Sequence, residues 1–155
     1  MKPIRLYRNA LAKLVTLGPR GWVLLVRAKL ALVAAKRDVS RRPQGELVGP
    51  GKIAPNVTAP LDRRADAERV AIAVRQVAAY SLLQPTCLVR SLAISKLLIA
   101  SGIEGGQIRV GVALRGDRFV AHAWVEYGGA VIGDDEDVAR RFATFDDLRQ
   151  ATNRS

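Results

Sequence analysis

The sequence predicts an α+β fold, and two patterns in the 155-residue chain carry that prediction. Apolar residues recur at helical spacing through most of the first hundred residues. Beyond them, the stretch from Gln107 to Gly133 has the pattern of short strands separated by turn sequences. Helices followed by an antiparallel meander are typical of the α+β class.

The N-terminal part is predicted to hold two helices, over residues 4–16 and from about Gly21 to Arg37. One stripe of the second helix is apolar, and we expect the rest of the chain to cover part of it: Trp22, Val26, Leu30 and Val33. Residues 40–60 contain four prolines and three glycines, which indicates a loop or linker.

Two more helices follow the linker. A helix is predicted over residues 62–80, with Asp62 as its N-cap. Another runs from Cys87 to just before Gly102 and is apolar nearly all round, which is typical of a buried helix.

The predicted strands are residues 107–114, 119–127 and 130–133, with Gly128-Gly129 as a hairpin turn. A short last helix is expected over residues 144–152, where a threonine and an aspartate are spaced as a capping box.

Composition excludes several classes of site. One cysteine cannot form an intramolecular disulfide, and one cysteine with one histidine cannot supply an ordinary structural zinc site. We therefore expect no metal and no cofactor. The apolar stretch over residues 22–35 is interrupted by Arg27 and Lys29 and is too short to span a bilayer. No signal-peptide pattern is present, so a cytoplasmic location is expected.

The net charge of +11 is concentrated at the N-terminal end. Residues 1–60 carry twelve Lys/Arg and two Asp/Glu, whereas residues 61–155 carry thirteen and twelve. Such a basic segment suits an acidic protein or anionic lipid, or it simply keeps the protein soluble. It has no nucleic-acid-binding motif, so no nucleic-acid partner is expected, and membrane contact stays open.

Cys87 is a candidate nucleophile. Pro85 favours a helix start two residues before it, and the backbone N–H groups of a helix start favour a thiolate. The alternative is that Cys87 is a small buried apolar residue, as lone intracellular cysteines often are.

His122 is the only possible base for this cysteine, since the chain has no other histidine. The hairpin after it returns two carboxylates, Asp134 and Asp135, toward the imidazole. A two-residue turn pairs His122 with Asp135, whereas a longer turn or a bulge places Asp134 on that side. The alternative is a hydrogen-bonded core histidine.

Three segments together resemble the lasso-peptide B protein family: CLVRSLAISKLL, IRVGVAL and AHAWVEYGGAVIGD. These proteins are leader peptidases with a papain/transglutaminase-like core, in which a catalytic helix packs on an antiparallel sheet. The match covers about residues 84–134. The resemblance implies that Cys87 is the nucleophile, His122 the base and Asp134 the acid that orients it.

The resemblance also implies an organisation and partners. Residues 61–155 would form the peptidase core and residues 1–60 a basic helical extension. The extension lacks the β-hairpin pattern of the precursor-recognition domain found in fused family members. The chain therefore resembles the split form, which acts on a precursor peptide with a separate recognition protein, similar to the pyrroloquinoline-quinone chaperone. A macrolactam synthetase would use the product.

Several further points remain open. Gln84 is either an oxyanion-hole donor or a loop residue, and Trp124 is either a wall of the site or core. Arg90 is expected to pair with a carboxylate such as Glu126 or to touch substrate. Two other function classes also fit: a transglutaminase-like amidase or acyltransferase with the same triad, and a noncatalytic basic binding module.

Overall fold

The computed structural model describes residues 18–41, 60–81 and 84–144. The elements, in chain order, are α2 (Pro19–Arg41), the 3-10 turn η1 (Leu61–Arg63), α4 (Arg64–Ala79), α5 (Cys87–Ala100), β1 (Gly106–Arg115), β2 (Arg118–Tyr127), β3 (Ala130–Ile132), α6 (Val138–Arg141) and β4 (Ala143–Thr144). This is the predicted α+β fold. The helix predicted over residues 4–16 lies outside the described residues, as does nearly all of the one predicted over residues 144–152.

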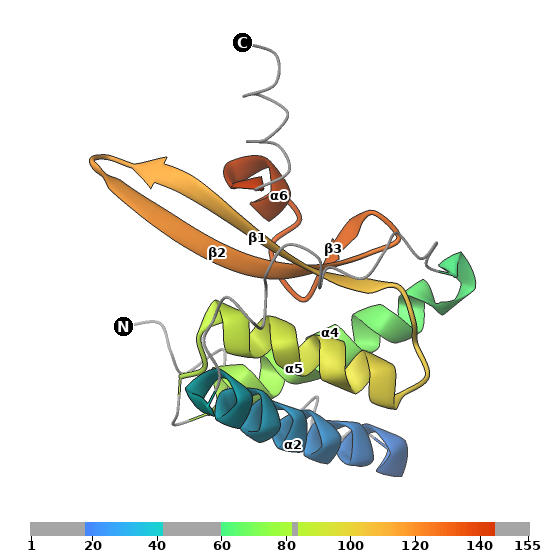
Figure 1. Ribbon diagram of the computed structural model, residues 1–155. Helices are drawn as coiled ribbons and strands as arrows, with labels where there is room; N and C mark the ends of the chain where they lie inside the picture. The colour runs from blue at the N-terminus through green and yellow to red at the C-terminus, as the bar shows by residue number, and fades with distance from the viewer. Residues whose placement is uncertain (1–17, 42–59, 82–83, 145–155) are drawn as a thin grey trace, which may run out of the picture.

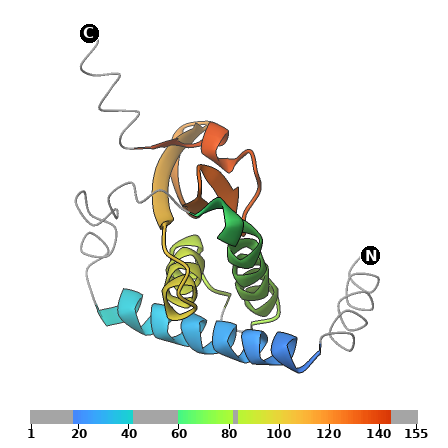
Figure 2. The same ribbon diagram turned by 90° about the vertical axis from the view of Figure 1, so that its right-hand side faces the viewer.

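The described elements form layers (Figures 1 and 2). An antiparallel sheet with the strand order β3-β2-β1-β4 lies on α4 and α5, and α2 crosses beneath both helices. The main core lies between the helices and the sheet, where β2 contributes Val125 and Tyr127. A smaller apolar cluster occupies the opposite sheet face and joins Trp124 to Val138 and Phe142.

The helix α5 begins and ends where the sequence predicts. Seven of its fourteen residues are buried, and it contacts α2, α4 and the sheet, whereas Ile99 near its end is 71% exposed. It stops at Gly102, whose φ of +66° is strained for other residues, and the Ile103 N–H then bonds the Leu98 carbonyl at 3.0 Å. The helix is thus a rigid rod that fixes the position of its first residue, Cys87.

The helix α2 buries a face other than the predicted stripe. Its buried residues are Ala28, Leu32 and Ala35, whereas Trp22, Val26 and Leu30 are 51%, 57% and 64% exposed. Alanines allow two helix backbones to approach closely, so the face with the small residues packs against α4 and α5. Of the predicted stripe, only Val33 is partly buried, and the other three residues stay exposed.

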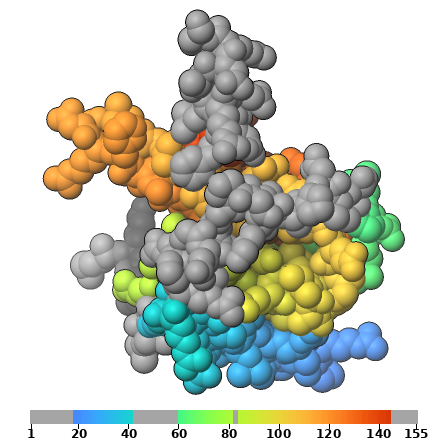
Figure 3. Space-filling model, in the orientation of Figure 1, coloured from blue at the N-terminus to red at the C-terminus, as the bar shows by residue number. Residues whose placement is uncertain are grey.

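Two further expectations need correction. Asp62 does not cap the third predicted helix, because residues 61–63 form a separate 3-10 turn and α4 starts behind it with Arg63 as an N-cap that makes no side-chain bond. The sequence also gave no sign of β4, which pairs with β1 at Gly111 and Val112. Beyond this pairing, the tip of the β1–β2 hairpin projects from the body (Figure 3).

Candidate active site

Cys87 is the first residue of α5, as predicted. Thr86 is the N-cap, and its hydroxyl accepts a hydrogen bond from the Val89 N–H at 3.4 Å. Cys87 is half-buried, so its sulfur is not sealed in the core. The N–H groups of a first helical turn lack intrahelical partners and attract negative charge. The local structure therefore places the only thiol of the chain in surroundings that suit an anion.

His122 and Asp134 form a hydrogen-bonded pair. The His122 Nε2–H donates to Asp134 Oδ2 at 2.8 Å, and the two side chains are 21% and 22% exposed. The Asp135 N–H donates to the other carboxylate oxygen of Asp134 at 2.9 Å. With Nε2 as the donor, the lone pair of the neutral ring lies on Nδ1. In this tautomer Nδ1 is the nitrogen that could take a proton from a nucleophile.

A glycine decides which aspartate meets the histidine. The hairpin has the two-residue turn, because Tyr127 pairs with Ala130 and Val125 with Ile132. In that register, simple alternation would bring Asp135 to His122. The strand β3 ends at Ile132, however, and Gly133 has a φ of +72°. This turn breaks the alternation and directs Asp134 to the imidazole.

Asp135 turns away from the imidazole. Its carboxylate pairs instead with Arg141 of α6 at 3.2 Å.

Aromatic rings form a wall beside the imidazole. The His122 ring stacks on Phe142 with a centroid distance of 5.2 Å, and Trp124 lies 6.5 Å away. Trp124 is 1% exposed, so it belongs to the core beneath the site. Gly111 makes room for these rings, because a Cβ there would lie 2.9 Å from both Phe142 and Trp124. The ring of His122 is therefore held by packing as well as by Asp134.

Polar contacts continue along the same face of β2. The Trp124 Nε1–H donates to one oxygen of Glu126 at 2.9 Å, and Arg109 Nε donates to the other at 3.1 Å. Glu126, the example given of a carboxylate partner for Arg90, thus pairs with Arg109 rather than with Arg90. Arg90 acts electrostatically on Asp134 instead.

Opposing effects set the pKa of Asp134. Burial raises it, but the hydrogen bonds from His122 and from the Asp135 N–H lower it, as do the positive charges of His122 and Arg90. The net result is a pKa below the ordinary value for an aspartate. Asp134 therefore remains charged at neutral pH and can accept the hydrogen bond of the imidazole.

Arg90 lies on the same helix as the cysteine. It lies three residues after Cys87 on α5, so the two share a side of the helix. Its positive charge is among those that lower the pKa of Asp134. Among the described residues, the structure joins His122 to Asp134 by a hydrogen bond but does not join Cys87 to His122.

Gln84 has an unusual backbone. It is the one non-glycine residue with positive φ in the described parts of the chain, at +35°, and it lies three residues before Cys87. Such conformations cost of order 1–3 kcal/mol and gather at functional sites. This backbone strain was not predicted from the sequence.

No group of three or more His, Cys, Asp or Glu side chains within the described ranges is placed to hold a metal ion. Likewise, none of the helices in the described parts is long and apolar enough to cross a membrane.

Comparison with known proteins places the chain in a family. No curated protein and no solved structure matches it significantly. The sequence model of the transglutaminase-like superfamily matches residues 28–145, which span most of α2, the whole of α4 and α5, and the sheet. This superfamily includes cysteine-based acyltransferases and peptidases. The chain therefore belongs to the transglutaminase-like superfamily.

Proposed function

We propose that this protein is a cysteine peptidase that cleaves the leader from a ribosomally made lasso-peptide precursor. The observations that support the chemistry are the hydrogen-bonded His122–Asp134 pair and the position of the only thiol of the chain at the start of α5. The resemblance over residues 84–134 supports the substrate class, since its motifs contain all three of these residues.

The proposed reaction is acyl transfer through a thioester. His122 Nδ1 takes the proton of Cys87, and the thiolate attacks the carbonyl carbon at the junction of leader and core. A sulfur–carbon bond forms, the carbon–nitrogen bond breaks, and the imidazolium protonates the departing amine. Water then hydrolyses the thioester, which releases the leader as a carboxylic acid and restores the thiol. Asp134 orients the ring and stabilises its charged form throughout.

Backbone donors at the start of α5 would stabilise the oxyanion. The Cys87 N–H belongs to the first turn of the helix, which has no intrahelical acceptors for its N–H groups. Gln84 is a second candidate donor, since it precedes this turn and is exposed.

The proposal includes partners and a location. A separate precursor-recognition protein, similar to the pyrroloquinoline-quinone chaperone, would deliver the leader, because residues 1–60 lack the pattern of a recognition domain. The freed amine would then be coupled by a macrolactam synthetase. Both steps would occur in the cytoplasm.

The test is incubation of the chain with a candidate precursor and its recognition protein, read by mass spectrometry. Cys87→Ala is expected to abolish cleavage while the far-ultraviolet circular dichroism stays unchanged. Ser95→Ala, on the same helix, is the matched control and is expected to cleave like the wild type. Cleavage by the alanine variant at the wild-type rate would end the cysteine-peptidase proposal.

The same assay separates the alternative functions. Turnover of small amides without a recognition protein, lost in Cys87→Ala, would indicate a general amidase or acyltransferase. No turnover of any amide, with a thiol that iodoacetamide fails to alkylate near neutral pH, would indicate a noncatalytic binding module.

A further inference from the structure

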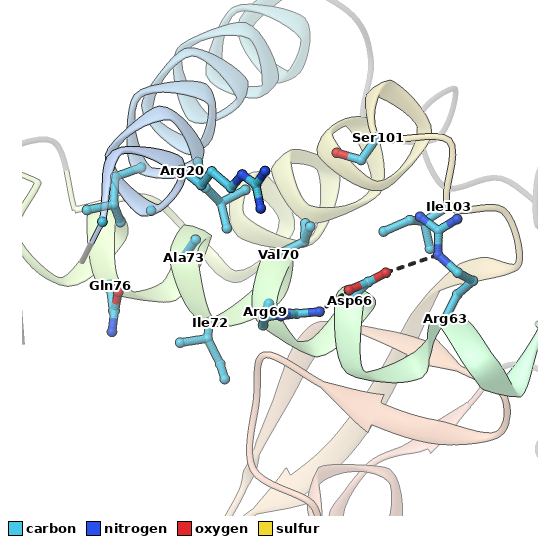
Figure 4. A pocket seen from close by; sticks show the side chains of 14 residues that line it. Arg20, Arg63, Asp66, Arg69, Val70, Ile72, Ala73, Gln76, Ser101 and Ile103 are labelled. Carbon is cyan, nitrogen blue, oxygen red and sulfur yellow. Dashed lines mark hydrogen bonds and ion pairs between the residues drawn. The ribbon is translucent and has the colours of Figure 1, made fainter. Parts of the chain in front are cut away.

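A groove with a volume of about 730 Å³ lies at the end of α5 remote from Cys87 (Figure 4). Its walls come from the first turns of α2, from one side of α4 and from the turn that follows α5. The volume is in the range of ligand-binding sites. None of the residues of the candidate active site lines it.

The groove combines an apolar floor with a cationic rim. Apolar lining residues come from three elements: Leu24, Leu25, Val70, Ile72, Ala73 and Ile103. Three arginines lie at its rim, namely Arg20, Arg63 and Arg69, and among the described residues that line it only Asp66 is acidic. Ile72 is 51% exposed, so apolar surface is available to a ligand.

Pairing within the rim leaves positive charge unbalanced. Asp66 bonds Arg63 at 3.1 Å and also bonds Arg69, so one carboxylate serves two guanidinium groups. Arg20 has no acidic partner among the described residues, and Figure 4 shows its side chain over the groove. The four charged lining residues therefore keep a net charge of +2, which favours a ligand with carboxylates.

Charge selects among possible occupants. Residues 1–17 of this chain carry four Lys/Arg and no acidic residue, so their charge opposes binding at an arginine rim. A second copy of the chain, with a net charge of +11, meets the same repulsion. A polypeptide segment with Asp or Glu beside apolar side chains matches both the rim and the floor.

The distance to the thiol suits a peptide substrate. Cys87 and Ser101 lie at opposite ends of α5, and fourteen residues of helix correspond to about 20 Å. An extended chain of about six residues bridges that distance. We propose that the groove binds an acidic, apolar segment of the peptide that Cys87 attacks. This inference rests on the proposed function for its substrate, but its binding test does not.

The binding test uses the full chain and a fluorescent peptide of Leu, Ala and Glu, measured by anisotropy. The matched probe has Lys in place of Glu. The Glu peptide is expected to bind more tightly, and Arg20→Glu should weaken its binding about fivefold to tenfold. Arg75→Glu is the matched control, because it makes the same charge change on α4 at an exposed residue outside the groove. An equal effect of both variants, or preference for the Lys peptide, would overturn the proposal.

Two substitutions of apolar residues test whether the peptide binds in the groove. Ile72→Ser should weaken binding about fivefold, since Ile72 lines the groove. Val26→Ser should leave binding unchanged, because Val26 is similarly exposed, at 57%, on the outer face of α2. Weaker binding in Val26→Ser alone would overturn the proposal. So would tighter binding to phosphatidylglycerol vesicles than to the peptide, since that would assign the basic surface to a membrane.

Cleavage assays then separate the groove from the chemistry. Peptide binding should persist in Cys87→Ala, whatever becomes of its activity. For a precursor with an acidic segment, Arg20→Glu should raise KM with little change in kcat, whereas Arg75→Glu should change neither. Loss of kcat without a change of KM in Arg20→Glu would contradict a binding role.

Discussion

The two faces of β2 have different roles, although side chains of the two faces alternate along one strand. Ala123, Val125 and Tyr127 are buried, and the latter two lie in the main core against the helices. His122 and Glu126 point to the opposite face, where their polar groups are hydrogen-bonded. One strand therefore stabilises the fold with one set of side chains and positions the candidate catalytic residues with the other.

The largest effect is expected on the helix-facing side. Tyr127 is fully buried, so Tyr127→Ala should lower the free energy of unfolding by about 3–5 kcal/mol. Activity per folded molecule should stay close to the wild type. Urea unfolding and active-site titration measure the two quantities. Tyr127→Phe is the control that removes only the bond to the Pro60 carbonyl, for a loss of about 1 kcal/mol.

The opposite face should show the reverse behaviour. Asp134→Ala is expected to reduce kcat by roughly 10²-fold or more, because it removes the group that orients His122. Its unfolding midpoint should fall much less than that of Tyr127→Ala, since the Asp134 side chain is 22% exposed and its loss leaves no cavity in the main core. Asp135→Ala is the neighbouring control and should remain active. A greater loss in Asp135→Ala would refute the assignment of Asp134.

Two glycines on β1 test the difference between the two faces of the sheet. Gly111→Ala would bring a Cβ within 3.0 Å of Phe142, Trp124 and the Ala143 carbonyl, so we expect about 1–3 kcal/mol of destabilisation together with lower activity. Gly106 faces the helices, where an added Cβ would lie 2.7 Å from the buried Leu98 and 4.0 Å from Val125. We therefore expect Gly106→Ala to disturb the main core but to leave the activity per folded molecule close to the wild type. Equal effects of both substitutions on cleavage would contradict the division between the faces.

The smallest effect concerns pH. The pKa of Asp134 is lower in the folded protein than in the unfolded chain, so its charged form stabilises the fold above the unfolded value of about 4. That contribution is lost as the pH falls through the folded pKa. Urea midpoints of the wild type and Asp134→Asn should therefore converge on acidification below about pH 4. A gap that does not narrow as the pH falls below about 4 would exclude this linkage.

Local signals predicted much of the fold. Pro85 and Gly102 bracket α5, and Gly128-Gly129 sets the β2–β3 register. These features could be predicted because turns and helix ends depend mainly on residues that are adjacent in the sequence. The sequence left Asp134 and Asp135 undecided, since the choice depends on the backbone of Gly133. The catalytic roles of Cys87, His122 and Asp134 remain predictions.

Long-range packing explains what the sequence could not show. The helix α2 has apolar residues on two sides, and only the approach of α4 and α5 selects the side of Ala28 and Ala35. The strand β4 is two residues long and exists through its pairing with Gly111 and Val112. The domain boundary proposed at residue 61 stays a prediction, although α2 packs into the same core as the later helices.

Gly133 has no side chain, yet its left-handed backbone makes the candidate site depend on which enantiomer of an amino acid stands there. An L-alanine there would have a disfavoured φ and a Cβ 2.9 Å from Ile94 and 3.0 Å from Ala71. A D-alanine prefers positive φ and directs its methyl group elsewhere. In a screen of genetic variants, changes at Gly133 would therefore resemble the loss of Asp134 itself. Semisynthesis with D-alanine at position 133 would show whether the site needs the positive φ of this residue or the absence of a side chain.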